Sequence, residues 1–141
     1  MYELRVVRER RQGYGDRRHI RTAQHVYEAF REHFEPADRE EFVAVLLDGR
    51  NRVIGFNVVS VGTLTTALVH PREVFKPAIL ANAAAIVLIH NHPSGDPEPS
   101  PEDRALTARL KQAADLMGIN LLDHVVIGDG RFRSFSEEGL L

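Results

Sequence analysis

The fold is decided by the stretch at residues 85–103, which reads AIVLIHNHPSGDPEPSPED. It begins with the continuous apolar run 85–89, a pattern typical of a strand buried in the centre of a sheet. Three prolines and a glycine fall within 90–99, so we expect a loop there. Ser100 then acts as the N-cap of a helix whose first turn contains Pro101. Loops that follow central strands are where α/β sheets usually place their ligands.

The rest of the chain predicts helices and strands that alternate. We expect helices over 22–34, from Pro71 to about Ala83, and from Ser100 to Gly118, and strands over 2–8, 42–47, 52–61, 67–69, 121–127 and 131–135. The predicted buried residues of the second and third helices are Val74, Phe75, Ile79 and Leu80, and then Leu106, Leu110, Ala113, Ala114 and Met117. This order implies an α/β layered domain with a mixed sheet.

Length and composition indicate one compact domain. The chain has 141 residues, and its hydrophobic fraction of 43% is enough to fill one core. We divide it into an N-terminal part, 1–38, with a strand, an amphipathic helix and a basic arm, and a main part, 39–141. There is no cysteine, which excludes disulfides and thiolate zinc sites. Any metal must therefore be held by His, Asp or Glu.

The charge is uneven along the chain. Residues 1–21 hold seven arginines against three acidic residues, a balance of +4, while the remainder has a balance of −6. The basic arm is suited either to nucleic acid or an acidic partner, or simply to solvent. No apolar stretch reaches the roughly 18 residues of a membrane span, and the first residues lack the order of a signal peptide. We expect a cytoplasmic protein without a membrane partner.

Three polar residues around the predicted loop have the spacing of a catalytic zinc site. His90 and His92 are two apart, so in an extended segment their side chains point the same way. Asp103 lies in the first turn of the next helix, where a carboxylate is favoured by the helix dipole. Two imidazoles and one carboxylate leave a fourth position open for water. Each residue alone also has an ordinary structural explanation, and it is their joint spacing that favours a metal.

The same spacing matches a known motif. H-x-H, seven residues, Ser, two residues and Asp resembles the JAMM motif of MPN-domain metalloproteases. Residues 69–76 (VHPREVFK), 90–97 (HNHPSGDP) and 122–128 (LDHVVIG) resemble the bacterial RadC family, and the likeness covers 39–141. The resemblance implies a three-layer MPN (JAB) domain, with a mixed curved sheet flanked by helices and a layered fold related to cytidine deaminases.

The resemblance also implies a role for each site residue. His90, His92 and Asp103 would bind one zinc ion per chain, and Ser100 would stabilise the oxyanion when a peptide or protein substrate is cleaved. The family's upstream glutamate would be Glu40 or Glu41. Family spacing favours Glu40, and so does strand alternation, because Glu40 shares a side with Phe42. Glu41 would then be a solvated charge.

Other polar residues are assigned supporting or surface positions. Asn91, Ser94 and His70 either line the site or are structural, and His124 follows Asp123 at the start of a strand, as a structural pair or a support for the site. We expect His19, His25 and His33 on the surface. RadC proteins usually carry a helix-hairpin-helix region, which residues 1–38 do not resemble. A zinc-dependent metallopeptidase or isopeptidase is the main hypothesis, and a DNA-associated protein or a non-catalytic interaction module are the alternatives.

Overall fold

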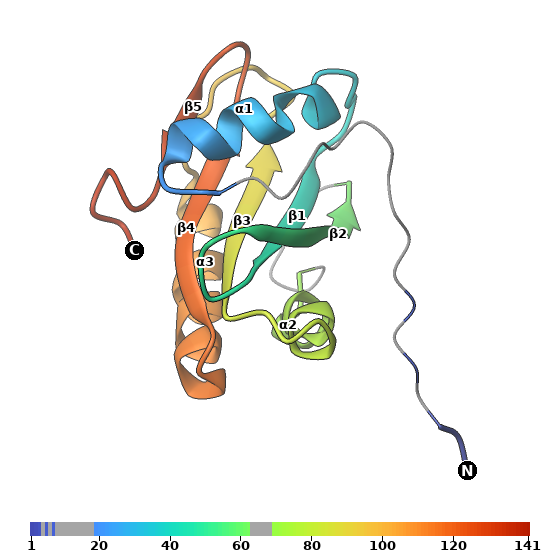
Figure 1. Ribbon diagram of the computed structural model, residues 1–141. Coiled ribbons are helices and arrows are strands. Elements are labelled where there is room, and N and C mark those ends of the chain that lie inside the picture. The colour runs from blue at the N-terminus through green and yellow to red at the C-terminus, as the bar shows by residue number, and fades with distance from the viewer. Residues whose placement is uncertain (4, 6, 8–18, 63–68) are drawn as a thin grey trace.

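The computed structural model describes residues 1–3, 5, 7, 19–62 and 69–141 (Figure 1). Its elements in chain order are α1 (Ala23–Phe34), β1 (Glu41–Leu47), β2 (Val53–Val61), α2 (Pro71–Leu80), β3 (Ala85–Asn91), α3 (Pro101–Met117), β4 (Asn120–Ile127) and β5 (Phe132–Ser134). The strands form one sheet in the order β2-β1-β3-β4-β5. Only β3 and β4 are parallel, and the other neighbours are antiparallel. The predicted mixed sheet is confirmed.

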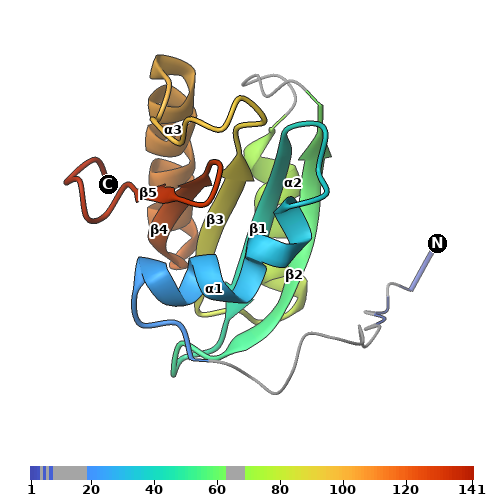
Figure 2. The same ribbon diagram turned by 90° about the horizontal axis from the view of Figure 1, so that it is seen from above.

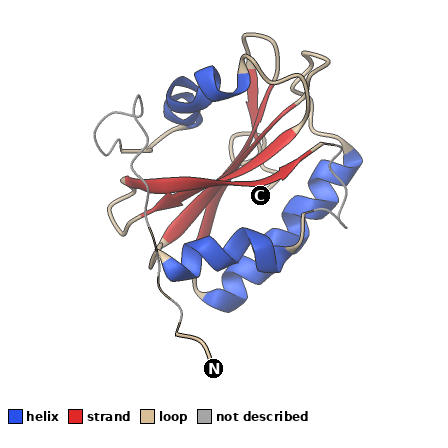
Figure 3. Cartoon of the chain, turned by 90° about the vertical axis from the view of Figure 1, so that its right-hand side faces the viewer, coloured by secondary structure: helices blue, strands red, loops and turns tan. Residues whose placement is uncertain are grey.

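The sheet lies between two helical layers (Figures 2 and 3). On one face, α1 buries Val26, Phe30 and Phe34 against β1, β3 and β4. On the other face, α2 and α3 pack against the alternate side chains of β1 and β3, including Phe42 and Leu88. Both faces of the central strand β3 are therefore covered, which explains its unbroken apolar sequence. The predicted three-layer α/β architecture is confirmed.

Local sequence signals set the ends of α1 and α3. The Thr22 hydroxyl caps α1 by accepting a hydrogen bond from the main-chain N–H of His25 at 3.2 Å. Ser100 and Asp103 form a reciprocal capping box at the start of α3. Gly118 ends α3 in the left-handed conformation, with φ of 69°. The start of α3, and with it the position of Asp103, is therefore set by the capping residue Ser100.

Two element boundaries differ from those predicted. β3 continues through His90 and Asn91, because both residues pair with β4, and His90 also pairs with Phe42 of β1. α2 ends at Leu80, where Ala81 is the C-cap and Asn82 takes a positive φ of 53°. Its last turn extends past the core, so Ile79 and Leu80 are 55% and 50% exposed. The predicted burial of these two residues is wrong, and Met117 at the end of α3 is exposed as well.

Two predicted strands fall partly on residues that lie outside the described part of the chain. These are residues 4, 6 and 8 of the strand expected over 2–8, and residues 67 and 68 of the strand expected over 67–69. Tyr2 and Val7, which are described, are exposed and lie outside any strand. Among the described helices, none combines the length and the apolar character that crossing a bilayer requires.

Candidate metal centre

The end of β3 and the start of α3 bring three side chains to one point. The Nε2 atoms of His90 and His92 are 3.0 Å apart. The Asp103 carboxylate closes the triangle, with Oδ1 3.3 Å from His90 Nε2 and Oδ2 3.1 Å from His92 Nε2. His90 and Asp103 are buried and His92 is partly exposed, so the group faces solvent on one side only.

The spacing of this triangle fits a small divalent cation. Ligand atoms held tetrahedrally at about 2.0–2.1 Å from zinc lie about 3.3 Å from one another. The two Nε2 atoms are 3.0 Å apart, and each lies 3.1–3.3 Å from one of the two Asp103 oxygens, so neighbouring ligand atoms are about as far apart as such a site requires. Among the described residues, this is the group of His, Asp and Glu side chains that could hold a metal ion.

The loop after β3 fixes which nitrogen of His92 faces the triangle. His92 Nδ1 lies 2.8 Å from the main-chain oxygen of Asp96. A carbonyl oxygen only accepts, so Nδ1 carries the proton and a neutral ring keeps its lone pair on Nε2. Without a metal, the hydrogen bond with Asp103 raises the pKa of His92, although burial opposes this. His92 Nε2 can therefore hold either a proton or a cation.

His90 is oriented by a longer chain of hydrogen bonds through β4 and α3. The Thr107 hydroxyl donates to the Asp103 carbonyl at 2.7 Å, so it must accept from His124 Nδ1, 2.6 Å away. His124 is fully buried, and burial holds its pKa well below the ordinary value, so its ring is neutral and Nε2 accepts. The neighbour of that Nε2 is His90 Nδ1, at 2.7 Å, which must donate.

The two histidines therefore both direct the Nε2 lone pairs of neutral rings toward one point. Lone pairs 3.0 Å apart repel each other unless a proton or a cation lies between them. The neutral imidazole nitrogen is the form in which histidine binds metals. The donor set thus fits a cation such as zinc, with the side chains of His90 and His92 already in the required tautomers.

Asp103 is held by the capping box at the start of α3. Its Oδ2 accepts from the main-chain N–H of Ser100 at 2.9 Å, and its own N–H donates to the Ser100 hydroxyl at 3.0 Å. Burial by itself would raise the pKa of Asp103, but the adjacent rings of His90 and His92 and the Ser100 N–H outweigh it and hold the pKa far below its usual range. The carboxylate is therefore ionised at any physiological pH.

The loop between β3 and α3 is seated on the turn between β4 and β5. The main-chain N–H of His92 donates to Ile127 O at 2.9 Å, and that of Asp129 donates to Gly95 O at 2.8 Å. Gly128 touches this loop so closely that a Cβ atom there would collide with Gly95 O and would lie 2.8 Å from Pro97 Cδ. A glycine is required at position 128 because the two backbones meet there.

The two candidate glutamates lie on opposite sides of the chain. Glu41 Oε2 is 2.8 Å from His33 Nε2 on the α1 side, and both side chains are largely buried. The predictions of a solvated Glu41 and a surface His33 are therefore wrong. Extending the alternation of β1 by one residue puts Glu40 on the side of Phe42. The charge of Glu40 raises the pKa of His92, although less than the hydrogen bonds with Asp103 and Asp96 and the charge of Asp103 do. If the Phe42–His90 pairing is extended by two positions, Glu40 lies across from His92.

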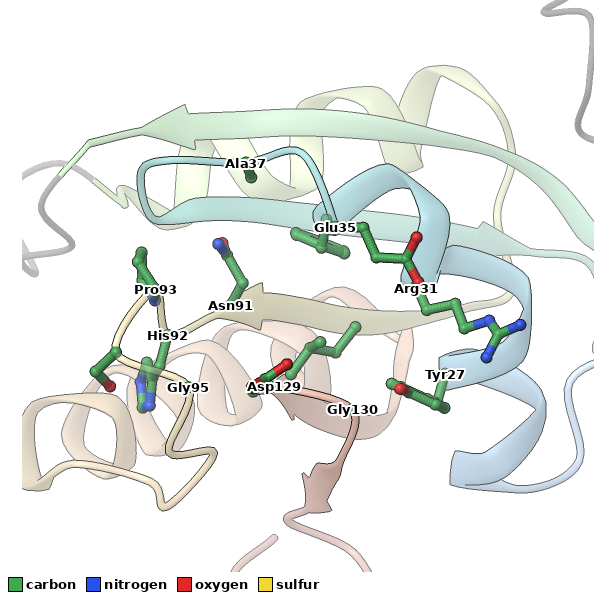
Figure 4. A pocket seen from close by; sticks show the side chains of 14 residues that line it. Tyr27, Arg31, Glu35, Ala37, Asn91, His92, Pro93, Gly95, Asp129 and Gly130 are labelled. Carbon is green, nitrogen blue, oxygen red and sulfur yellow. The ribbon is translucent and has the colours of Figure 1, made fainter.

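A pocket of about 460 Å³ lies beside the triangle, on the α1 side of β3 (Figure 4). Its walls include Tyr27 and Arg31 of α1, Asn91 and His92 at the end of β3, and Asp129 of the β4–β5 turn. His92 is shared between the pocket and the metal triangle.

The remaining polar residues have structural positions. The His70 ring caps α2 by accepting from the Arg72 N–H at 3.3 Å, and His19 and His25 are exposed, as predicted. His124 lies in the middle of β4 rather than at the start of a strand. Thr107 was not predicted to matter, although a polar residue four positions after Asp103 on the buried face of a helix is a signal that sequence reasoning could use.

Comparison with known proteins agrees with this geometry. The family described as the RadC-like JAB domain matches residues 20–140. A UPF0758 protein of Geobacter sulfurreducens is 52% identical over 120 residues, which are 85% of this chain and 52% of that protein. A UPF0758 protein of Rubrobacter xylanophilus is 59% identical over 104 residues, or 74% of this chain and 45% of the relative.

The chain spans about half the length of the curated relatives it matches. The match covers α1, the whole sheet and all three residues of the metal triangle. The fold, the motif spacing and the family match all agree, and the chain belongs to the RadC-like JAB domain family.

Proposed function

We propose that this chain is a zinc-dependent hydrolase that cleaves an amide bond in a peptide or protein. The observation that carries the proposal is the convergence of the His90 and His92 lone pairs with the Asp103 carboxylate, at separations of 3.0–3.3 Å. Three protein ligands with a fourth position open are the arrangement of catalytic rather than structural zinc. When bound, zinc would lower the pKa of a coordinated water to about 7 and polarise a substrate carbonyl.

Glu40 is the general base and acid in this proposal. Strand alternation supports a position on the metal side of the sheet, and the charge of Glu40 contributes to the raised pKa of His92. Its carboxylate takes the proton of the attacking water and delivers it to the nitrogen of the leaving amine. Glu41 has no such role, because its side chain is bonded to His33 on the other side of the sheet.

Ser100 is the proposed donor to the oxyanion that forms on the scissile carbonyl. Its oxygen accepts from the Asp103 N–H as a helix cap. Among the described residues, none accepts a hydrogen bond from its hydroxyl, and the proposal assigns this hydrogen to a substrate oxygen. The capping bond fixes the hydroxyl beside the metal ligand Asp103, so donation requires no rearrangement. Ser100 thus combines a structural and a catalytic role.

The test compares Glu40→Gln with Glu41→Gln, two identical changes at adjacent positions. Both purified variants and the wild type are analysed for zinc and incubated with a peptide library, and products are identified by mass spectrometry. We expect about one zinc per chain in all three proteins, and hydrolysis lowered about 10²–10⁴-fold only in Glu40→Gln. Full activity in Glu40→Gln contradicts its proposed role.

Metal content separates this function from the alternative of a non-catalytic module. His92→Ala should lose the zinc that the wild type retains, because it removes one of three ligands. A wild-type protein that holds no zinc after preparation without chelators contradicts the hydrolase proposal as a whole. That result would support an interaction module instead.

A further inference from the structure

Asn91 separates the two metal-binding histidines, but its side chain serves a different part of the molecule. The side chains of His90, Asn91 and His92 alternate along the end of β3, so Asn91 points away from His92 (Figure 4). Asn91 is only 5% exposed, and a buried amide must find partners for both its oxygen and its nitrogen. Those partners identify what Asn91 holds.

Both partners are main-chain atoms that flank Glu40. Asn91 Oδ1 accepts from the Glu41 N–H at 2.7 Å, and Nδ2 donates to the Arg39 carbonyl at 2.9 Å. The orientation of the amide is unambiguous, because an N–H only donates and a carbonyl only accepts. In a parallel sheet, a residue pairs with its neighbour by the same two bonds: its N–H donates to the carbonyl before the neighbour, and its carbonyl accepts from the N–H after it. The Asn91 side chain therefore extends the sheet by one step, opposite Glu40.

No main-chain pairing can replace this contact at the end of β3. The β1–β3 ladder ends at the Phe42–His90 pair, and the next main-chain N–H, that of His92, is committed to Ile127 O of β4. On its other side, the Glu40 carbonyl accepts from the Gly62 N–H at 2.7 Å. Glu40 precedes β1, yet its backbone is fixed on both sides, by Asn91 and by Gly62.

We propose that Asn91 is a positioning residue, whose side-chain amide holds the backbone of Glu40 so that the Glu40 carboxylate faces the metal site. The inference rests on the role of Glu40 proposed above. It gives the middle residue of the His90–His92 motif a task of its own. The flanking histidines hold the metal, and the residue between them holds the acid–base group in register with it.

The test uses Asn91→Ala, which removes both hydrogen bonds, with Ser94→Ala as the control. Ser94 lines the same pocket, but its recorded contact is a long one of 3.4 Å with the Asp96 N–H. Hydrogen exchange should show that the Glu41 amide loses protection in Asn91→Ala and keeps it in Ser94→Ala. Removing a residue that supports a metal ligand usually lowers metal affinity at least tenfold. Asn91 supports no ligand, so Asn91→Ala should change zinc affinity by less than this. Unchanged protection of the Glu41 amide overturns the inference.

A double-mutant cycle then shows whether Asn91 acts through Glu40. The readout is the midpoint of the pH-dependent change in the visible spectrum of the Co²⁺-loaded protein, measured for Asn91→Ala, Glu40→Gln and the double variant. We expect both single variants to shift the midpoint in the same direction, and Asn91→Ala to add nothing in the Glu40→Gln background. Additive shifts overturn the inference, because Asn91 would then affect the metal independently of Glu40.

Two further results keep the inference apart from the proposed function. A midpoint that Glu40→Gln leaves unchanged contradicts the role of Glu40, while hydrogen exchange still decides whether Asn91 holds the segment. If Asn91→Ala does not fold, Asn91→Gln replaces it, since it keeps the amide but displaces it by one methylene. It should shift the midpoint in the same direction by a smaller amount, and a midpoint identical to that of the wild type overturns the inference.

Discussion

His90 Nδ1 and His124 Nε2 lie 2.7 Å apart, and this contact joins a proposed metal ligand to a histidine 34 positions later. His124 donates its Nδ1–H to the Thr107 hydroxyl, and that hydroxyl donates to the Asp103 carbonyl, so the hydrogen-bond chain ends in α3. The two segments that carry the proposed ligands His90 and Asp103 are thus connected through the protein itself. A chain with this direction keeps the His90 proton on Nδ1 and its lone pair on Nε2.

Thr107→Val should weaken zinc binding without touching a ligand. Valine has nearly the same shape but no hydroxyl, so His124 Nδ1 loses its acceptor and the opposite tautomer is no longer excluded. That tautomer would direct an N–H at His90 Nδ1. We expect zinc affinity to fall about tenfold, and the metal-free protein to lose about 1–3 kcal/mol of unfolding free energy. Calorimetric zinc titration and denaturant unfolding measure the two effects.

The control for this prediction is Thr107→Ser, which keeps the hydroxyl. It should bind zinc as the wild type does. Its unfolding free energy should fall only by the small packing contribution of one methyl group. Equal zinc affinities for the valine and serine variants would show that the hydroxyl does not act on His90.

Gly128→Ala should disturb the metal centre through the loop that bears His92. An added Cβ would collide with the main-chain oxygen of Gly95 and with the ring of Pro97. Neither can move aside alone, as the end of a flexible side chain could. The loop between β3 and α3 must therefore move, and we expect a loss of about 1–3 kcal/mol in stability together with weaker zinc binding. Gly55→Ala is the matched control, because nothing lies within 4 Å of its added Cβ. Equal zinc affinities for the two variants would contradict this coupling.

Local periodicity explains why the positions of the three proposed ligands could be predicted, and it agrees with the choice of Glu40 that family spacing favours. His90 and His92 share a side because alternate residues of a strand do, and Asp103 is placed by the capping signals of Ser100 and Pro101. The same alternation put Glu40 on the side of Phe42. The sequence could therefore indicate the metal triangle, since each of its parts depends on a short segment of regular structure.

The role of His124 could not be predicted in this way, because β4 contains an irregularity. Ile86 pairs with Leu121 and Val87 pairs with Asp123, so Leu122 is an extra residue. Simple alternation from Leu121, which packs against α2 and α3, would turn His124 toward α1. The bulge reverses the alternation and brings His124 to His90 and Thr107. Single-sequence patterns do not show where such a bulge occurs.

Zinc affinity should rise with pH through the neutral range. In the metal-free protein the hydrogen bond with Asp103 raises the pKa of His92 above its ordinary 6.5. A raised pKa means that the His92–Asp103 pair stabilises the fold fully below the unfolded value and loses this effect as pH rises through the folded value. The Asp103 pKa is lowered, so this carboxylate stays ionised, whereas the proton on His92 competes with zinc.

We therefore expect apparent zinc affinity to increase about tenfold for each pH unit below the His92 pKa, and to level off above it. Zinc titrations between about pH 5 and about pH 8 cover the range in which histidine titrates. His25→Gln, a change at an exposed histidine outside the site, should keep the same dependence. An affinity that does not vary with pH in the wild type would exclude proton competition at His92.

Asp123 connects the C-terminal segment to the sheet by hydrogen bonds. Two replacements of Asp123 should show whether its charge or its hydrogen bonds stabilise the fold. Its Oδ1 accepts from the N–H groups of His124 and Ser136 at 2.7 and 2.9 Å, and Oδ2 accepts from the Ser134 hydroxyl at 2.6 Å. Burial nevertheless raises the pKa of Asp123, because these contacts do not fully replace water. Asp123→Ala leaves buried donors without an acceptor and should cost about 3 kcal/mol of unfolding free energy.

Asp123→Asn keeps a carbonyl for the two N–H donors and removes the buried charge, so it should change the unfolding free energy by less than about 1 kcal/mol. Denaturant unfolding of the metal-free variants at neutral pH measures both values, and hydrogen exchange at the Ser136 amide reports whether the C-terminal segment stays attached. Protection of this amide should be lost in Asp123→Ala and kept in Asp123→Asn. If both variants lose the same stability, the carboxylate charge rather than its acceptor geometry holds this segment, because the asparagine retains the acceptor but not the charge.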